Sequence, residues 1–137
     1  MKVVLSMPDL QIISMFQNIT GSNVIDCYVN DELYFVVKEG QYGLAVGKKG
    51  IKIKNAEAKL KKKIKVIEHS DDLEKFIKNM IPEVKEISLK EGSEGKTIEI
   101  KIASNDRAKV IGKEGKNIKI IKNFLNRLFD IQDFKVK

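Results

Sequence analysis

The apolar residues at the start of the chain recur at helical spacing. This pattern predicts a first helix that is capped by Ser6 and stopped by Gly21. Two strand-like runs follow at 24–29 and 33–38, joined by a turn whose residue types tolerate left-handed backbone, Asn30 and Asp31. The helix's predicted buried stripe is Leu10, Ile13, Phe16 and Ile19.

The rest of the first half predicts two more helices and one more strand. A short segment at 41–46 leads to Gly47, and a longer helix beyond it carries Ile53, Ala56 and Leu60. A β-branched run at 64–67 then predicts a third strand.

The second half predicts the same elements in the same order. Its first helix is capped by Ser70 or Asp71 and ended by Pro82, and strands at 84–90 and 96–102 flank a glycine-containing turn at 91–95. A short helix from about residue 105, a longer helix and a final strand at 130–136 complete it. The predicted buried positions are Leu73, Phe76, Ile77, Met80 and Ile81 in the first helix, with Ile118, Ile121, Leu125 and Leu128 in the long one.

This parallel order reflects an internal repeat. The segment from Ala45 to Gly50 returns as the segment from Val110 to Gly115, 65 residues later. The flanking pattern repeats at the same offset: Ile53 meets Ile118, Lys54 meets Lys119, Ala56 meets Ile121, Leu60 meets Leu125 and Val66 meets Ile131. We therefore predict an α+β fold of two domains, 1–68 and 69–137, each ordered helix, strand, strand, helix, helix, strand. The short junction predicts a fixed relative orientation and one continuous binding surface.

Composition and charge restrict the kind of binding partner that the protein can have. The chain has 137 residues, of which 26 are basic and 19 acidic, giving a net charge of +7. A pI near 9.4 favours a polyanionic partner. With a single cysteine, Cys27, no intramolecular disulfide can form, and no apolar run is long enough to span a membrane. We expect a compact cytoplasmic protein, with a monomer as the default state.

The repeated glycine pairs have a physical use. A glycine that ends one helix can adopt left-handed backbone, and a second glycine before the next helix leaves the backbone open to a phosphate chain. The helix that follows offers backbone N–H groups at the positive end of its dipole. The loop tips are Lys48 and Lys49 in one copy and Lys113 and Glu114 in the other, so three of the four tip residues are cations.

The sequence holds no catalytic or metal-binding constellation. His69 and Cys27 form no cluster with metal-ligand spacing, and no nucleophile–base pair is indicated. Neither glycine loop matches the phosphate loop of nucleotide hydrolases or the dinucleotide fingerprint. We expect no enzyme activity, no cofactor and no metal.

Taken together, the element order and the run from Val110 to Ile118 resemble the K-homology (KH) domain in its prokaryotic, type II topology. In that family the Gly-x-x-Gly loop grips the backbone of a short single strand, beside an apolar groove for the bases. The resemblance implies that the tandem pair binds single-stranded RNA. Ile53 and Ile118 are further groove candidates, although plain core packing explains them equally well. The implied RNA-binding residues are Val46, Gly47, Lys48, Lys49, Gly50, Ile51 and Lys52, with Ile111, Gly112, Lys113, Glu114, Gly115, Lys116 and Asn117.

A pair of such domains with little else is most similar to the archaeal NusA-related transcription proteins. This resemblance implies a role in transcription termination or antitermination and a partner in the transcription machinery. Two departures stand out: Ala45 and Val46 replace a pair of large aliphatic residues, and Glu114 places a carboxylate beside the expected phosphate path.

Two other functions stay open. The chain could be a protein-interaction module that docks on RNA polymerase or the ribosome with little RNA affinity. A reader of duplex DNA is the other alternative, although such modules are typically helical and the flanking strands argue against it.

Overall fold

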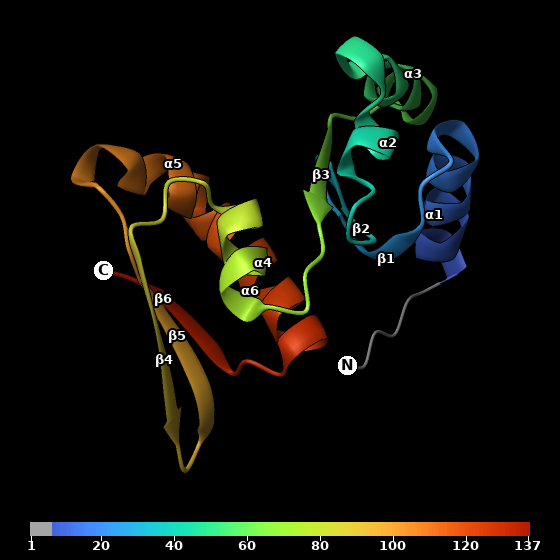
Figure 1. Cartoon of the computed structure of the whole chain (residues 1–137). Coiled ribbons are helices and arrows are strands. Elements are labelled where there is room, and N and C mark those ends of the chain that lie inside the picture. Colours follow the sequence, from blue (N-terminus) through green and yellow to red (C-terminus); the bar gives the residue numbers. More distant parts are fainter. Residues whose placement is uncertain (1–6) are drawn as a thin grey trace. The chain divides into compact units, whose positions relative to one another are not determined.

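The computed structural model describes residues 7–137, which fall into two compact units divided between Asp71 and Asp72 (Figure 1). Each unit is described by itself. The predicted Ser6 cap lies outside the described residues.

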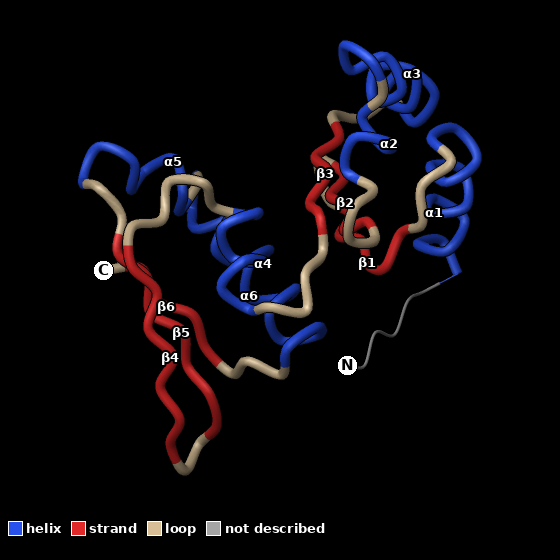
Figure 2. The backbone as a smooth tube through the Cα atoms, viewed as in Figure 1, coloured by secondary structure: helices blue, strands red, loops and turns tan. Residues whose placement is uncertain are grey.

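The first unit has the predicted order of elements. Its strands form a sheet in the order β1-β2-β3, in which β1 pairs antiparallel and β3 pairs parallel with the central β2 (Figure 2). The elements are α1 (Met7–Thr20), β1 (Val24–Val29), β2 (Leu33–Val37), α2 (Tyr42–Val46), α3 (Ile51–Leu60) and β3 (Ile64–Glu68).

The core of the first unit lies between the helices and one face of this sheet. Phe16 of α1 stacks on Phe35 of β2, with ring centroids 4.1 Å apart. Ala45 and Ala56 bring α2 and α3 onto the same cluster, and both are fully buried. Small side chains at these two positions let the helices on either side of the glycine loop lie close to the sheet.

Two local expectations for the first unit are wrong. Leu10 is 44% exposed, so the buried side of α1 is narrower than the periodicity predicted. Neither Asn30 nor Asp31 adopts a positive φ. The turn is held instead by the Asn30 carboxamide oxygen, which accepts from the Glu32 N–H at 3.0 Å.

The second unit repeats this topology. Its sheet has the order β4-β5-β6, with β4 antiparallel and β6 parallel to β5. Its elements are α4 (Leu73–Met80), β4 (Glu86–Gly92), β5 (Gly95–Lys101), α5 (Arg107–Ile111), α6 (Lys116–Phe129) and β6 (Asp133–Val136). Both type II KH topology and the α+β class are therefore confirmed.

Several boundaries in the second unit differ from prediction, among them the start of β4, which lies at Glu86 and not at residue 84. Asp72, and not Ser70 or Asp71, caps α4, because its carboxylate accepts from the Glu74 N–H at 3.1 Å. The strands of the hairpin pair as far as Gly92 and Gly95, so the turn is shorter than the predicted 91–95 segment. The final strand begins at Asp133 and not at residue 130, because Asp130 has a φ of 58° as the cap that ends α6.

The 65-residue offset fails after the long helix. Helix α3 has 10 residues and α6 has 14, so α6 contains about one additional turn. Consequently Val66 lies in β3 while Ile131 precedes β6, and the predicted correspondence of these two residues is wrong. The offset holds over the short helix, the loop and the start of the long helix, which are the parts that build the candidate site.

Candidate nucleic-acid interface

The two glycine loops have the same backbone conformation. Gly47 has φ 77° and ψ 170°, and Gly112 has φ 78° and ψ 169°. The third residue of each loop is left-handed, with φ 56° at Lys49 and 58° at Glu114. The repeat seen in the sequence is thus also a repeat of geometry, although Lys49 and Glu114 carry opposite charges.

The first glycine of each loop cannot be replaced without disturbance. Its φ and ψ fall in a region that glycine alone occupies readily. A β-carbon on Gly47 would lie 2.7 Å from Cγ of Lys52, and one on Gly112 would lie 2.9 Å from the backbone nitrogen of Asn117. The chain therefore makes a close approach here, between the end of the short helix and the start of the long one.

The second glycine of each loop has a different conformation and different surroundings. Gly50 and Gly115 are left-handed residues, with φ 73°, that begin α3 and α6, and a β-carbon on either would meet open space. The open side of each loop lies at this glycine. A phosphate chain could approach the backbone there without meeting a side chain.

The turn uses some of the amides that the sequence assigned to an anion. The Gly50 N–H donates to the Gly47 carbonyl at 3.1 Å, and the Ile51 N–H donates to the Lys48 carbonyl. The second loop has the equivalent bonds, from Gly115 to Gly112 and from Lys116 to Lys113. The first amide of each long helix, one of those offered to an anion, is therefore already paired within the loop, because each loop closes as a tight 3₁₀ turn.

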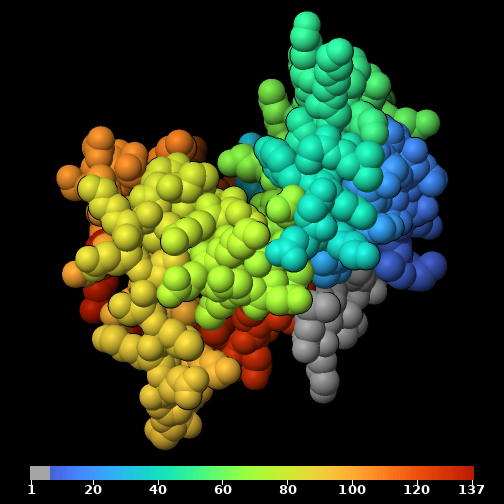
Figure 3. Space-filling view, in the orientation of Figure 1, coloured from blue at the N-terminus to red at the C-terminus, as the bar shows by residue number. Residues whose placement is uncertain are grey.

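The loop tips are accessible. Lys48 and Lys49 are exposed, as are Lys113 and Glu114. In Figure 3 the segment coloured between cyan and green, around residues 48–50, projects from the surface. Cations held at the tip of a rigid turn can reach a polyanion without rearrangement of the core.

Two predicted binding residues are engaged in holding the loops. The Lys52 ammonium donates to the Thr20 carbonyl at the end of α1, at 2.9 Å, while its stem packs against Gly47. Asn117 occupies the equivalent position, and its carboxamide NH₂ donates to the Lys109 carbonyl at 3.0 Å. These contacts fix each loop to its own unit.

The apolar candidates divide by burial. Val46 and Ile111, just before the loops, are half-buried, whereas Ile51 just after the first loop is 51% exposed. Ile53 is half-buried and packs on the core of the first unit, which favours core packing for that residue. The structure also exposes Tyr42 and Leu44 beside the first loop, which the sequence analysis missed because they precede the motif by several residues.

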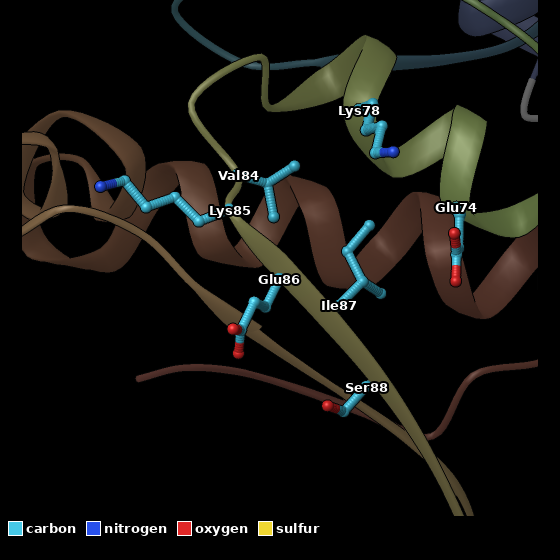
Figure 4. A pocket seen from close by; sticks show the side chains of 7 residues that line it. All are labelled: Glu74, Lys78, Val84, Lys85, Glu86, Ile87 and Ser88. Atoms are coloured by element: carbon cyan, nitrogen blue, oxygen red, sulfur yellow. The ribbon is translucent and has the colours of Figure 1, made fainter.

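A groove in the second unit lies elsewhere. It runs between α4, which contributes Glu74 and Lys78, and the start of β4 (Figure 4). Acidic and basic side chains both line this groove, and residues of the glycine loops do not. Its lining is Glu74, Lys78, Val84, Lys85, Glu86, Ile87 and Ser88.

Residues 7–137 contain neither a cluster of metal ligands nor a helix suited to a membrane. No group of three or more His, Cys, Asp or Glu side chains in this part of the chain could hold a metal ion. No helix within the same residues has the length and apolar character to cross a bilayer.

Comparison with known families defines the class of protein. Residues 11–90 match the family described as "KH domain", and residues 70–137 match the family described as "KhpA/KhpB, KH domain". Both units are therefore KH domains, the class of RNA-binding domain that uses a Gly-x-x-Gly loop.

Relatives that match nearly the whole chain identify its family more narrowly than the domain matches do. A probable transcription termination protein NusA of Methanococcus vannielii is 39% identical over 99% of this chain and 80% of its own length. A protein of the same name from Methanocaldococcus jannaschii is 37% identical over 98% of this chain and 75% of its own length. The crystal structure of APE1850 aligns over 97% of this chain and 100% of that protein, with a TM-score of 0.81 and 35% identity. The chain belongs to the archaeal NusA-like family of tandem KH-domain proteins.

Proposed function

We propose that this protein binds single-stranded RNA by gripping its backbone with both Gly-x-x-Gly loops, and that it acts in the cytoplasm as a NusA-type termination or antitermination factor. The observation that carries the proposal is the recurrence of one loop geometry in both units, with exposed residues at each tip. A helix connector with no ligand has no need of the same strained first glycine in two places.

The mechanism follows from the loop. The first glycine brings the two helices close together, the second leaves the backbone uncovered, and Lys48, Lys49 and Lys113 neutralise phosphates. Lys52 and Asn117 hold each loop in this shape before RNA arrives, which lowers the ordering cost of binding.

Half-buried Val46 and Ile111 lie beside the two loops and supply the edge of an apolar path for the bases. The transcription role rests on the names of the relatives. A docking module for RNA polymerase or the ribosome, with weak RNA affinity, is the alternative that must be tested against it.

A charge reversal at the first loop tests the proposal. Lys48→Asp combined with Lys49→Asp should weaken binding of a single-stranded RNA at least tenfold and lower the slope of log affinity against log salt by about 1.4, about 0.7 for each lost phosphate contact. Fluorescence anisotropy at several KCl concentrations measures both quantities. The fold should survive, because both side chains are exposed.

A matched control is available in the same unit. Lys61→Asp combined with Lys63→Asp makes the same change in charge on exposed residues, and Lys61 is left-handed like Lys49. If the control pair lowers affinity as much as the loop pair, binding is a general charge effect and the loop grip is wrong. Preference for duplex DNA would favour the DNA-reading alternative. Retention of RNA polymerase without RNA affinity would favour docking.

A further inference from the structure

The two loops share a backbone, but the side chains beside them differ in kind. Helices α2 and α5 and the loops after them correspond residue for residue at the 65-residue offset. At three of these positions the first unit has an apolar residue where the second unit has a cation. Tyr42 corresponds to Arg107, Leu44 to Lys109 and Ile51 to Lys116.

The three apolar residues, here called the apolar flank, are unusually exposed. Tyr42 is 48% exposed, Leu44 43% and Ile51 51%. Among the described residues, seven large hydrophobic side chains are exposed by more than a third, and three of the seven fall within the ten residues from 42 to 51. Single exposed apolar residues are ordinary, but three within ten residues around one loop make these side chains candidates for contact with a ligand.

The three cations, here called the cationic flank, lie beside a loop whose tip has less positive charge than the first. The second loop has Lys113 and Glu114 at its tip, so the charges there cancel, whereas Lys48 and Lys49 give the first tip two positive charges. From residue 107 to 116 there are four basic residues and one acidic residue, against two basic and none acidic from 42 to 51. Positive charge is therefore placed beside the loop in the second unit and at its tip in the first.

These arrangements suit different parts of a nucleotide. A contact between a cationic side chain and a phosphate carries no information about the base. An aromatic ring beside a phosphate-holding tip offers a face on which an unpaired base can stack, and aliphatic side chains can cover the same base. The three residues of the apolar flank lie within seven residues of two exposed lysines in the sequence, a combination that suits an occupant both anionic and partly apolar, as single-stranded RNA is.

We propose that the two loops divide the work: the first holds phosphates and stacks a base on Tyr42, and the second, with Arg107 and Lys116 beside its tip, holds phosphates without an aromatic stack. This inference rests on the proposed RNA-binding function and deepens it. It makes the first unit the one whose affinity depends on the presence of a base, since an aromatic ring stacks on any base. The second unit contributes affinity that is independent of sequence.

The anchoring of Tyr42 supports this role. Its backbone N–H donates to the Glu68 carboxylate at 3.1 Å, which fixes the start of α2 to the end of β3 while the side chain stays half exposed. A ring presented from a fixed backbone loses little conformational entropy on stacking. Lys109 of the cationic flank is 3.1 Å from the Glu83 carboxylate. The test therefore leaves this ion pair in place and changes Arg107 and Lys116.

The test uses the full chain and two probes of equal length: a single-stranded RNA 12-mer of mixed sequence and an abasic ribose-phosphate 12-mer. Tyr42→Ala should weaken RNA binding about tenfold, the order of one base–aromatic stack, with an unchanged salt slope and unchanged affinity for the abasic chain. Tyr42→Phe should restore RNA binding. Arg107→Gln with Lys116→Gln should weaken both probes by a similar factor and lower the salt slope by about 1.4.

Leu89→Ala is the matched control, because Leu89 is 48% exposed on β4 and lies outside both loops. Its RNA affinity should equal that of the wild type. Far-UV circular dichroism verifies that each variant is folded.

Three results would overturn the division of work. Unchanged RNA binding by Tyr42→Ala would assign the apolar flank to a protein partner or to solvent. An equal loss on RNA and abasic chain would make Tyr42 a structural residue, and a loss confined to RNA in the Arg107 variant would make both loops base readers. If the wild type bound neither probe, the proposed function itself would fail. This outcome differs from the three above, in all of which the wild type binds RNA.

Discussion

At the scale of single residues, the two glycines of each loop have different roles. The first glycine is constrained by its φ and ψ and by the side chain packed against it, whereas the second is constrained by φ alone. The sequence motif treats them as equivalent. Their different surroundings are visible only in three dimensions, because Lys52 and Asn117 return to the loop from the next helix.

This difference predicts unequal costs. Gly50→Ala should cost about 1 kcal/mol of unfolding free energy, the ordinary penalty for a left-handed alanine. Gly47→Ala should cost more, about 3 kcal/mol, because a glycine-only conformation and a contact at 2.7 Å add to that penalty. Urea denaturation of the two variants measures the difference. Equal costs would mean that the packing of Lys52 against Gly47 does not constrain the loop.

At the scale of elements, the second sheet is tied together by one carboxylate. Glu99 of β5 is 3.1 Å from the Lys90 ammonium on β4 and 3.1 Å from the Lys137 ammonium at the end of the chain. Hydrogen bonds from Lys137 and Lys90 hold the pKa of Glu99 below its ordinary 4.5. A neighbouring group, Asp133 of β6, has its pKa lowered by the Phe134 N–H and by Lys122.

A lowered pKa in the folded state gives a definite pH dependence. The ionised Glu99 stabilises the fold above the unfolded pKa, and that contribution disappears as the pH falls through the lower folded value. Glu99→Gln should therefore be less stable than the wild type at pH 7, and the difference should shrink as the pH is lowered from 4.5. Thermal unfolding across pH 3 to 7 measures it, with Glu94→Gln at the exposed hairpin turn as control. A difference that stays constant with pH would show that these ion pairs do not stabilise the sheet.

Element order was predictable from sequence, but element ends were not. Helical and strand periods are averages over many residues, so they located each helix and strand of both units. The ends depend on single contacts: Asp72 caps α4 through one hydrogen bond, and Asp130 ends α6 by adopting a positive φ. The additional turn of α6 also ends the 65-residue correspondence beyond the long helix, because a fixed offset takes no account of an insertion.

The candidate site was predictable in the same partial way. The glycines and the tip lysines are local in sequence, so the motif identified them. The apolar flank was missed at Tyr42 and Leu44, because only the exposure of α2 distinguishes them from core residues. The holding role of Lys52 was also missed, since its partner, the Thr20 carbonyl, is 32 residues away.

At the scale of the whole molecule, the tandem arrangement changes what weak loops can do. A loop of four residues has room for few phosphates, and a single contact of this kind is weak at physiological salt. Two loops in one chain convert the second contact into an intramolecular event, which can raise overall affinity by a factor of roughly 10² to 10⁴ when one strand reaches both. The proposed function therefore depends on the pair and not on either unit alone.

The most direct test of the central claim is a map of backbone amide chemical shifts in the ¹⁵N-labelled full chain on titration with a single-stranded RNA. If both loops grip the backbone, the largest changes will fall on residues 47–51 and 112–116, and they will diminish as salt is raised. Large changes confined to other surfaces, such as the groove between α4 and β4, with both loops unchanged at saturating RNA, would contradict the account.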